Sequence, residues 1–213
     1  MARISDKTPR GGAKPGGAQG STRRQAVREA AVTLFARQGY HATSTAEVAR
    51  LAGVSEGTIF YYFGNKEGIL LDLLAEVHLK YRQRMESALA KAANGMQAVL
   101  GCVDLHFKQV RQDSRLLTLL VRDLPVSPGR NDSQCRQVMR EQSSLILEVL
   151  CLALRRGQED GSVAADLPLP ETGLLIRSLL IGATRLLLLK LAPEVNFEDQ
   201  AAEFCRRALA PPG

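Results

Sequence analysis

The 213-residue chain contains no tryptophan, and aromatic residues make up only 5% of it. Because β-sheets draw heavily on aromatic and β-branched residues, this scarcity, together with abundant Leu and Ala, favours helices. Hydrophobic residues at 45% and charged residues at 23% are ordinary globular proportions, which excludes a wholly disordered chain. No segment has a convincing strand pattern, so we expect an all-α protein of about nine helices.

Catalytic and metal-binding motifs are also missing. The sequence has no nucleophile elbow, no glycine-rich phosphate loop and no His-Glu-x-x-His motif, and its three histidines lie in separate regions. Cys102 and His106 are four residues apart on one helical face and could share a metal, but no third ligand is suitably spaced. We therefore predict no enzyme activity, no cofactor and no metal.

Secretion and membrane signals are absent as well. The four cysteines are widely spaced without a Cys-x-x-Cys pair, which predicts reduced, mostly buried thiols in a cytoplasmic protein. The basic N-terminus is not followed by the apolar run of a signal peptide. The most apolar stretch, residues 173–191, is interrupted by Arg177, Arg185 and Lys190, whereas a membrane span needs about 20 mostly apolar residues.

The formal net charge of +6 is concentrated at one end of the chain. Residues 1–66 contain ten Lys and Arg against four acidic residues, and the remainder contains 18 of each sign. This asymmetry indicates a polyanion-binding end on a neutral body, although a basic tail that only aids solubility is an alternative. Residues 1–21, rich in Gly, are expected to be a disordered arm that either enters a minor groove or adds weak attraction.

Apolar periodicity and breaking residues place the helices. Ser44 and Glu47 form a capping box, Gly53 suits a left-handed turn, and Ser55 and Asn65 suit helix N-caps. The expected helices span residues 22–38, 45–52, 56–63, 66 to about 92, 96–111, 114–123, 133–158, 171–191 and 197–209.

Residues 45–63 have the anatomy of a helix-turn-helix. Val48 and Ala49 face inward on the first helix, and Ile59 and Phe63 bury the second. Many helical hairpins that do not bind DNA share this spacing, so the evidence for DNA binding comes from the residues that face outward. Hydroxyls cluster at the N-terminus of the first helix, where the helix dipole and free N–H groups favour a phosphate; they belong to Thr43, Ser44 and Thr45.

Lys66 and two tyrosines strengthen that interpretation. A cation in the first turn of a helix, such as Lys66, opposes the helix dipole at a cost of about 0.3–1 kcal/mol, which a phosphate would offset. A merely solvated Lys66 is the alternative. Because adjacent residues cannot share one helical face, at least one of Tyr61 and Tyr62 should be exposed to a partner, while the other packs inside.

The segment from Arg24 to Leu71 resembles the N-terminal domain of the tetracycline-repressor (TetR) family of bacterial regulators. The resemblance rests on the nearly continuous run AAVTLFARQGYHATSTAEVARLAGVSEGTIFYYFGNKEGILLDLL. It implies a three-helix DNA-binding domain with a recognition helix in the major groove. The DNA contacts that it implies are Thr43, Ser44, Thr45, Ser55, Glu56, Gly57, Thr58, Phe60, Tyr61, Tyr62 and Lys66.

Two positions depart from the family pattern. Phe60 stands where the family commonly has Tyr, so a hydroxyl contact to phosphate is lost and the ring is free to pack instead. Glu56 places an acid at the tip of the recognition helix. It either accepts a hydrogen bond from a cytosine amino group or only stabilises the helix N-terminus.

The C-terminal part of the chain is expected to bind an effector and to dimerise. The resemblance implies that its last two helices pair with those of a second subunit, although an interior helix of a monomer is the alternative. The interface candidates are Leu175, Leu179, Gly182, Ala183, Leu186, Phe197, Ala201 and Phe204. The effector-pocket candidates, each of which could be ordinary core, are Cys102, Leu105, His106, Leu117, Leu120, Met139, Leu145 and Leu150.

These expectations together describe a cytoplasmic, homodimeric regulator of transcription. Its arm would span residues 1–21, its helix-turn-helix domain 22–68, and its effector and dimerisation domain 69–213. We expect a repressor that a small apolar or amphipathic molecule releases from a palindromic DNA operator, without any membrane partner. A ligand-independent activator or architectural protein is one alternative, and a small all-α enzyme is the other.

Overall fold

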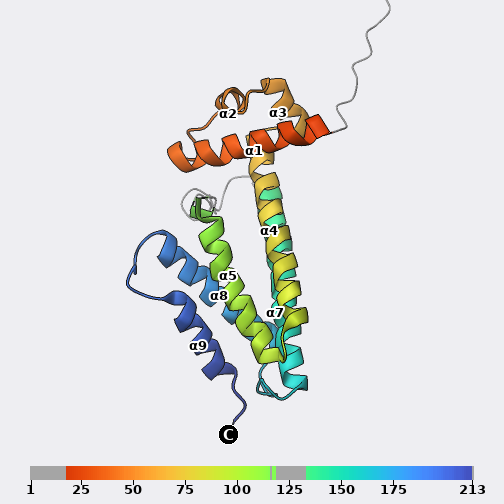
Figure 1. Ribbon diagram of the computed structural model, residues 1–213, viewed down its shortest axis with the longest axis vertical. Helices are drawn as coiled ribbons and strands as arrows, with labels where there is room; N and C mark the ends of the chain where they lie inside the picture. Colours follow the sequence, from red (N-terminus) through yellow and green to blue (C-terminus); the bar gives the residue numbers. More distant parts are fainter. Residues whose placement is uncertain (1–17, 116, 119–132, 213) are drawn as a thin grey trace, which may run out of the picture.

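The computed structural model describes residues 18–115, 117–118 and 133–212, and these residues form helices joined by short connections (Figure 1). The predicted all-α fold is therefore confirmed. The helices are α1 (Ala18–Gln38), α2 (Thr45–Ala52), α3 (Glu56–Phe63), α4 (Lys66–Lys91), α5 (Gly95–Gln112), α7 (Ser133–Glu159), α8 (Leu169–Leu188) and α9 (Phe197–Leu209). Of the helix expected over residues 114–123, residues 114, 115, 117 and 118 are described and are helical; its other residues, and most of the arm expected before residue 22, fall outside the described residues.

Most helix boundaries agree with the prediction, and α1 and α8 differ for local reasons. Helix α1 begins at Ala18 rather than Thr22, because Ala18 and Gln19 are good helix formers that extend it through Gly20. Helix α8 begins at Leu169, where Pro170 suits a first helical turn. It ends at Leu188 instead of Leu191.

Local capping fixes the short helices as expected. The Ser44 backbone N–H donates to Glu47 Oε2 (2.8 Å), and Ser44 Oγ accepts from the Glu47 backbone N–H, which completes the capping box of α2. Gly53, with φ +66°, ends α2 in the left-handed conformation that glycine adopts without strain. Ser55 and Asn65 cap α3 and α4 through their side chains.

The apolar side chains gather in two cores that share α4. The head core packs α1, α2 and α3 around Phe35, Val48 and Ile59, and it takes in α4 as far as Leu74, beyond the boundary expected after residue 68. The body core packs the later turns of α4, from Tyr81 onward, with α5, α7, α8 and α9. Figure 1 shows α4 running from the head, which carries α1 across its end, down into the body. Helix α4 is therefore one continuous rod through both cores.

The start of α5 packs closely against the end of α7 and the loop that follows it. A Cβ on Gly95 would lie 2.0 Å from the backbone nitrogen of Gly157, so only glycine allows α5 and α7 to approach this closely. The N-terminal N–H groups of α5 donate to the side chains of Asp160 (2.7 Å) and Ser162 (3.0 Å). These partners satisfy donors that a helix N-terminus leaves without intrahelical acceptors.

A polar chain crosses the body core and joins three helices. His106 on α5 bonds through Nδ1 to the hydroxyl of Tyr81 on α4 (3.0 Å) and through Nε2 to that of Thr184 on α8 (2.7 Å). Burial lowers the pKa of His106 to about 4, against a smaller opposing effect of the Leu180 carbonyl. The imidazole is therefore neutral near pH 7.

We predict that this neutral histidine makes the fold sensitive to acid. Between the folded pKa of about 4 and the unfolded value of about 6.5, the unfolded chain binds more protons, so stability falls as pH drops through this window. His106 alone should cost about 3 kcal/mol between pH 7 and pH 4. Urea unfolding of the wild type and of His106→Gln at several pH values measures the effect. An equal pH dependence in both proteins would contradict it.

Candidate DNA-binding surface

The outward face of α3 is exposed, and its inward face is fully packed. Ile59 and Phe63 belong to the head core, whereas 52% of Phe60 and 66% of Tyr61 is exposed. We call Ser55, Glu56, Gly57, Phe60 and Tyr61 the recognition face, because all five are exposed at or beside the N-terminus of α3 or on its outer side. Phe60 does not pack inside, since Ile59 and Phe63 already fill the inward face.

The adjacent tyrosines divide as expected. Tyr61 is exposed, and Tyr62 is half-buried against the head core. The two rings meet edge to face with their centroids 4.9 Å apart. The Tyr62 hydroxyl is buried and has no hydrogen-bond partner among the described residues, so only Tyr61 presents its hydroxyl to a surface partner.

Hydrogen bonds tie the tip of α3 to the start of α2. Thr45 Oγ1 donates to Glu56 Oε1 (2.5 Å), and the hydroxyls of Ser55 and Thr58 lie 2.9 Å apart. Glu56 thus bridges the N-termini of two helices, and it also places an acid in the first turn of α3, as one of the two alternatives expected. This bridge holds the hydroxyl of Thr45 beside the recognition face.

Thr43 is not a surface donor as its position in the sequence suggested. It is 2% exposed, and its hydroxyl donates to the carbonyl of Gly39 (2.8 Å) within the turn between α1 and α2. Because this hydroxyl is buried, Thr43 offers no contact to a phosphate at the surface. Ser44 is exposed, and its Oγ donates to Glu47 Oε2 (2.9 Å).

Lys66 also has an internal partner that the sequence did not reveal. Its Nζ donates to the carbonyls of Tyr40 (2.8 Å), His41 (3.3 Å) and Thr43 (2.7 Å), and it lies 4.5 Å from the centroid of the Tyr40 ring. An ammonium group has three protons, so all of them are engaged. Burial lowers the pKa of Lys66, and Glu47 opposes that shift. Lys66 is therefore neither a free donor for a phosphate nor a solvated side chain, the two interpretations that the sequence suggested.

We therefore predict that Lys66 stabilises the head more than it attracts DNA. Lys66→Met should lower the free energy of unfolding by about 2–3 kcal/mol, because three carbonyls lose a charged donor. The salt dependence of DNA binding should change little, since no free ammonium is removed. Lys108→Met, which loses only an exposed pair with Asp104, is the control. A large loss of salt slope without destabilisation would contradict the assignment.

A charged cluster that sequence analysis missed joins the head to α4. Asp72 accepts from Arg24 and from Arg28 Nε (2.5 Å), and Glu76 pairs with Arg28 (2.7 Å). Burial disfavours the charged form of Asp72, but the bonds from both arginines outweigh it, and its pKa is lowered. Part of the positive charge of the N-terminal third is thus neutralised internally.

The effector-pocket candidates do not line a common described cavity. Cys102 and Leu150 are fully buried in the body core, and four others are half-buried: Leu105, His106, Leu117 and Leu145. Leu120 and the side chain of Met139 lie outside the described residues. None of the eight borders the described cavity, which lies between α1, α4 and the end of α5.

The interface candidates divide between an exposed face and the core. Ala183 and Ala201 are buried in the body core, so these two are not available to a partner. Leu175 is 71% exposed and Phe204 is 60% exposed. The exposed face of α8 consists of Leu174, Leu175, Ser178, Ile181, Gly182, Arg185 and Leu186, while Leu179 and Phe197 are partly buried against the core.

The described part of the chain has neither a metal-binding cluster nor a helix that could span a membrane. It contains no group of three or more His, Cys, Asp and Glu side chains that could hold an ion. Both ring nitrogens of His106, one half of the Cys102–His106 pair, are bonded to hydroxyls. No described helix has the length and hydropathy needed to cross a bilayer.

The geometry defines a helix-turn-helix transcription regulator with a separate helical body, and comparisons with known proteins specify the family. Residues 27–73 match the family described as bacterial regulatory proteins, tetR family. The chain is 30% identical over 139 residues to the fatty acid metabolism regulator protein of Bacillus subtilis (strain 168), covering 65% of this chain and 70% of the relative. The chain belongs to the tetR family of DNA-binding regulators.

Other relatives agree with this assignment. The transcriptional regulator TtgR of Pseudomonas putida is 29% identical over 157 residues, which is 68% of this chain and 71% of that protein. Among solved structures, the regulator FadR from Bacillus subtilis in complex with stearoyl-CoA superposes with a TM-score of 0.75 at 23% identity, covering 87% of this chain and 98% of that one. This last similarity establishes the shared fold.

Proposed function

We propose that the protein is a ligand-released repressor that binds a palindromic operator as a homodimer in the cytoplasm. The observation that carries this proposal is the exposed recognition face at one end of a rod, α4, whose other end lies in the body core. A ligand that favours one position of α4 changes the separation of two heads. By linkage, DNA and ligand then weaken each other's binding by one common factor.

We propose fewer DNA-contacting residues than the sequence suggested. They are the recognition face, together with Ser44 and Thr45 at the start of α2. Phe60 and Tyr61 place exposed rings where a thymine methyl or a phosphate would meet them. Thr43 and Lys66 support this surface from within the head.

The proposed dimer forms through the exposed apolar face of α8 together with Phe204 of α9. Several large apolar side chains on this face are exposed, including Leu174, Leu175 and Ile181. Contiguous exposed apolar surface of this kind marks an interaction site. Gly182 and Ser178, in the middle of the face, allow a partner helix to approach closely.

The proposed effector is an amphipathic molecule with a long apolar chain, held near the half-buried side chains of α5 and α7. Support comes from two relatives, one named as a fatty acid metabolism regulator and one solved with stearoyl-CoA. We propose no catalytic step. The imidazole of His106 contacts the Thr184 hydroxyl (2.7 Å), but burial lowers the pKa of His106 to about 4, which makes it a weak base, and Thr184 is itself buried. The buried thiol of Cys102, whose pKa burial raises to about 12, is a poor nucleophile.

Stearoyl-CoA tests the effector proposal directly. With a DNA site selected from random sequence, saturating stearoyl-CoA should weaken binding about 5- to 150-fold, the range of typical allosteric coupling. Fluorescence anisotropy measures this change, and free coenzyme A, which lacks the apolar chain, is the control. Unchanged affinity with stearoyl-CoA would overturn the acyl-CoA assignment, and indifference to a broad ligand panel would favour the ligand-independent alternative.

A further inference from the structure

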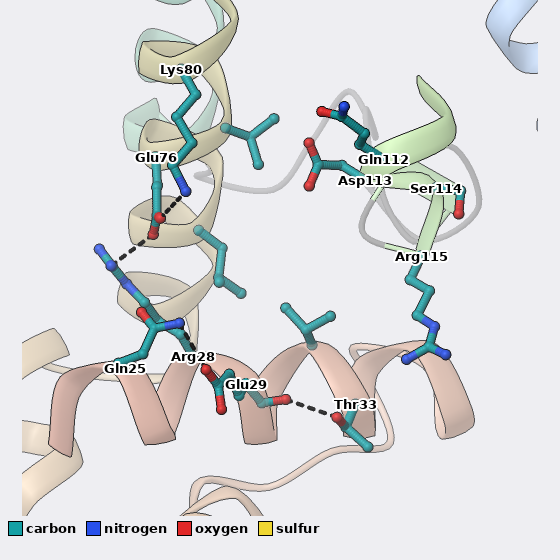
Figure 2. A pocket seen from close by; sticks show the side chains of 13 residues that line it. Gln25, Arg28, Glu29, Thr33, Glu76, Lys80, Gln112, Asp113, Ser114 and Arg115 are labelled. Atoms are coloured by element: carbon teal, nitrogen blue, oxygen red, sulfur yellow. Dashed lines mark hydrogen bonds and ion pairs between the residues drawn. The ribbon is translucent and has the colours of Figure 1, made fainter. Parts of the chain in front are cut away.

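A cavity of about 490 Å³ lies where α1 of the head meets α4 and the end of α5 in the body (Figure 2). Its apolar lining is formed by Val32, Leu73 and Val77, which pack in or against the head core. The rest of its lining is polar and comes from both parts of the molecule. Because no effector-pocket candidate borders it, this junction cavity is distinct from the effector site proposed above.

The basic side chains on the α1 and α4 walls are engaged in ion pairs. Arg28 pairs with Asp72 (2.5 Å) and with Glu76 (2.7 Å), and Lys80 pairs with Glu76 (2.5 Å). Figure 2 shows the pairs of Glu76 with Arg28 and Lys80 running along one side of the cavity. Arg28 and Lys80 share Glu76, and Arg24 and Arg28 share Asp72, so these basic groups are occupied by ion pairs although the two carboxylates do not fully balance them.

The opposite wall presents a carboxylate without a cation. Asp113 ends α5, is half-buried, and points across the cavity toward α4 in Figure 2. It accepts a bond from the amide of Gln109 but forms no ion pair within the described residues. Burial raises the pKa of Asp113, and the nearby charge of Glu76 adds to this shift, whereas Arg84 and Lys80 oppose it.

Two other charged side chains line the cavity. Glu29 on α1 accepts a bond from the amide of Gln25 (2.9 Å), and Arg115 lies exposed at the rim. Neither forms an ion pair with the residues that the structure describes. The carboxylates of the lining that form no described ion pair are thus Glu29 and Asp113. The lining as a whole is balanced, with Arg28, Lys80 and Arg115 against Glu29, Glu76 and Asp113, so the position of Asp113 rather than a net charge favours a cation.

We propose that the junction cavity binds a small organic cation, an ammonium group carried on a short apolar body. The ammonium donates to Asp113, whose charge it neutralises, and the apolar body lies over Val32, Leu73 and Val77. A charge-assisted hydrogen bond away from bulk water is stronger than a neutral one, which gives the site its preference for a cation. Such a ligand contacts head and body together.

If the protein is the repressor proposed above, a ligand in this cavity would also affect DNA binding. Since α1 moves with the head while Asp113 belongs to the body, a bound cation stabilises one placement of the head. That placement sets how well two heads match an operator. The cation and DNA would then be coupled in the same way as the main effector and DNA.

Binding of hexylamine to the full chain without DNA tests the proposal by isothermal titration calorimetry. Hexylamine should bind at least about tenfold more tightly than the isosteric hexanol, and hexanoate should bind no better than hexanol. Asp113→Asn should weaken hexylamine about tenfold or more. Asp104→Asn, which alters an exposed carboxylate paired with Lys108 on the same helix, should leave binding unchanged. Arg115→Gln should not weaken it.

The result that overturns the proposal is equal binding of hexylamine and hexanol, or equal effects of Asp113→Asn and Asp104→Asn. Tighter binding of hexanoate would reverse the assigned charge. If Asp113→Asn does not fold, the ranking of hexylamine, hexanol and hexanoate on the wild type decides the proposal. Because no DNA is present, failure here leaves the repressor proposal intact, and failure of stearoyl-CoA to release DNA leaves this site intact.

Discussion

A Gly182→Leu chain is expected to sediment as a monomer and the wild type as a dimer. A Cβ at Gly182 meets no atom within 4 Å in the subunit, so the new side chain fits the folded monomer. It would, however, occupy the space that a partner helix needs at the centre of the exposed α8 face. Losing the second head removes the gain from two linked sites, so DNA affinity should fall about 10²- to 10⁴-fold.

Ala90→Leu provides the matched control for this prediction. Ala90 is an exposed small residue on α4, and the same side chain there should leave the dimer intact. Leu175→Glu offers a second variant, because a carboxylate at a residue that is 71% exposed costs nothing in the monomer but would be buried in the dimer. Analytical ultracentrifugation gives the answer. A Gly182→Leu protein that remains dimeric places the interface elsewhere.

A Tyr61→Glu substitution is expected to weaken DNA binding about 100-fold while leaving the fold stable. Tyr61 is the most exposed large side chain of α3, so its replacement disturbs little of the head core. A carboxylate on the recognition face would, however, meet the phosphates of the duplex, and like charges held together cost several kcal/mol. A binding titration at two salt concentrations measures both the loss and its electrostatic origin.

The control for this charge is Ala90→Glu, which adds the same carboxylate to α4. Its effect on DNA binding should be small, since charges beyond about 10 Å are largely screened in physiological salt. Equal losses of DNA affinity in Tyr61→Glu and Ala90→Glu would show that only the net charge of the protein affects binding. The recognition face would then be assigned wrongly.

Local sequence signals predicted the head well. The capping box of Ser44 and Glu47 and the left-handed Gly53 fix the ends of α2 through contacts within a few residues, and the structure contains both. The buried positions Ile59 and Phe63 follow from the period of the helix. Such features depend on neighbours along the chain, so they can be inferred without knowing the tertiary structure.

Partners distant in the chain were harder to predict. Lys66 bonds to carbonyls more than 20 residues earlier, and nothing in its immediate sequence indicates them. The arginine cluster offered a usable signal, because Arg24 and Arg28 are spaced by one turn, as are Asp72 and Glu76. Matching charge spacings on two helices can identify a pair of helices that pack together.

Helix α8 shows why apolar content alone does not assign an interface. It is apolar almost all round, so its sequence could not say which side faces its own subunit. Ala183 faces the body core, while Leu175 and Gly182 face outward. Only the packing of α5, α7 and α9 against α8 separates the two sides.

Selection of bound fragments from random duplex DNA tests the central claim most directly. If α3 of two paired subunits reads the major groove, the recovered sites should be inverted repeats, with half-site centres separated by about one helical turn of DNA or a multiple of it. Enrichment should disappear for Tyr61→Glu and persist for Ala90→Glu. Recovery of no preferred sequence, or of an asymmetric one bound by a single subunit, would contradict the account.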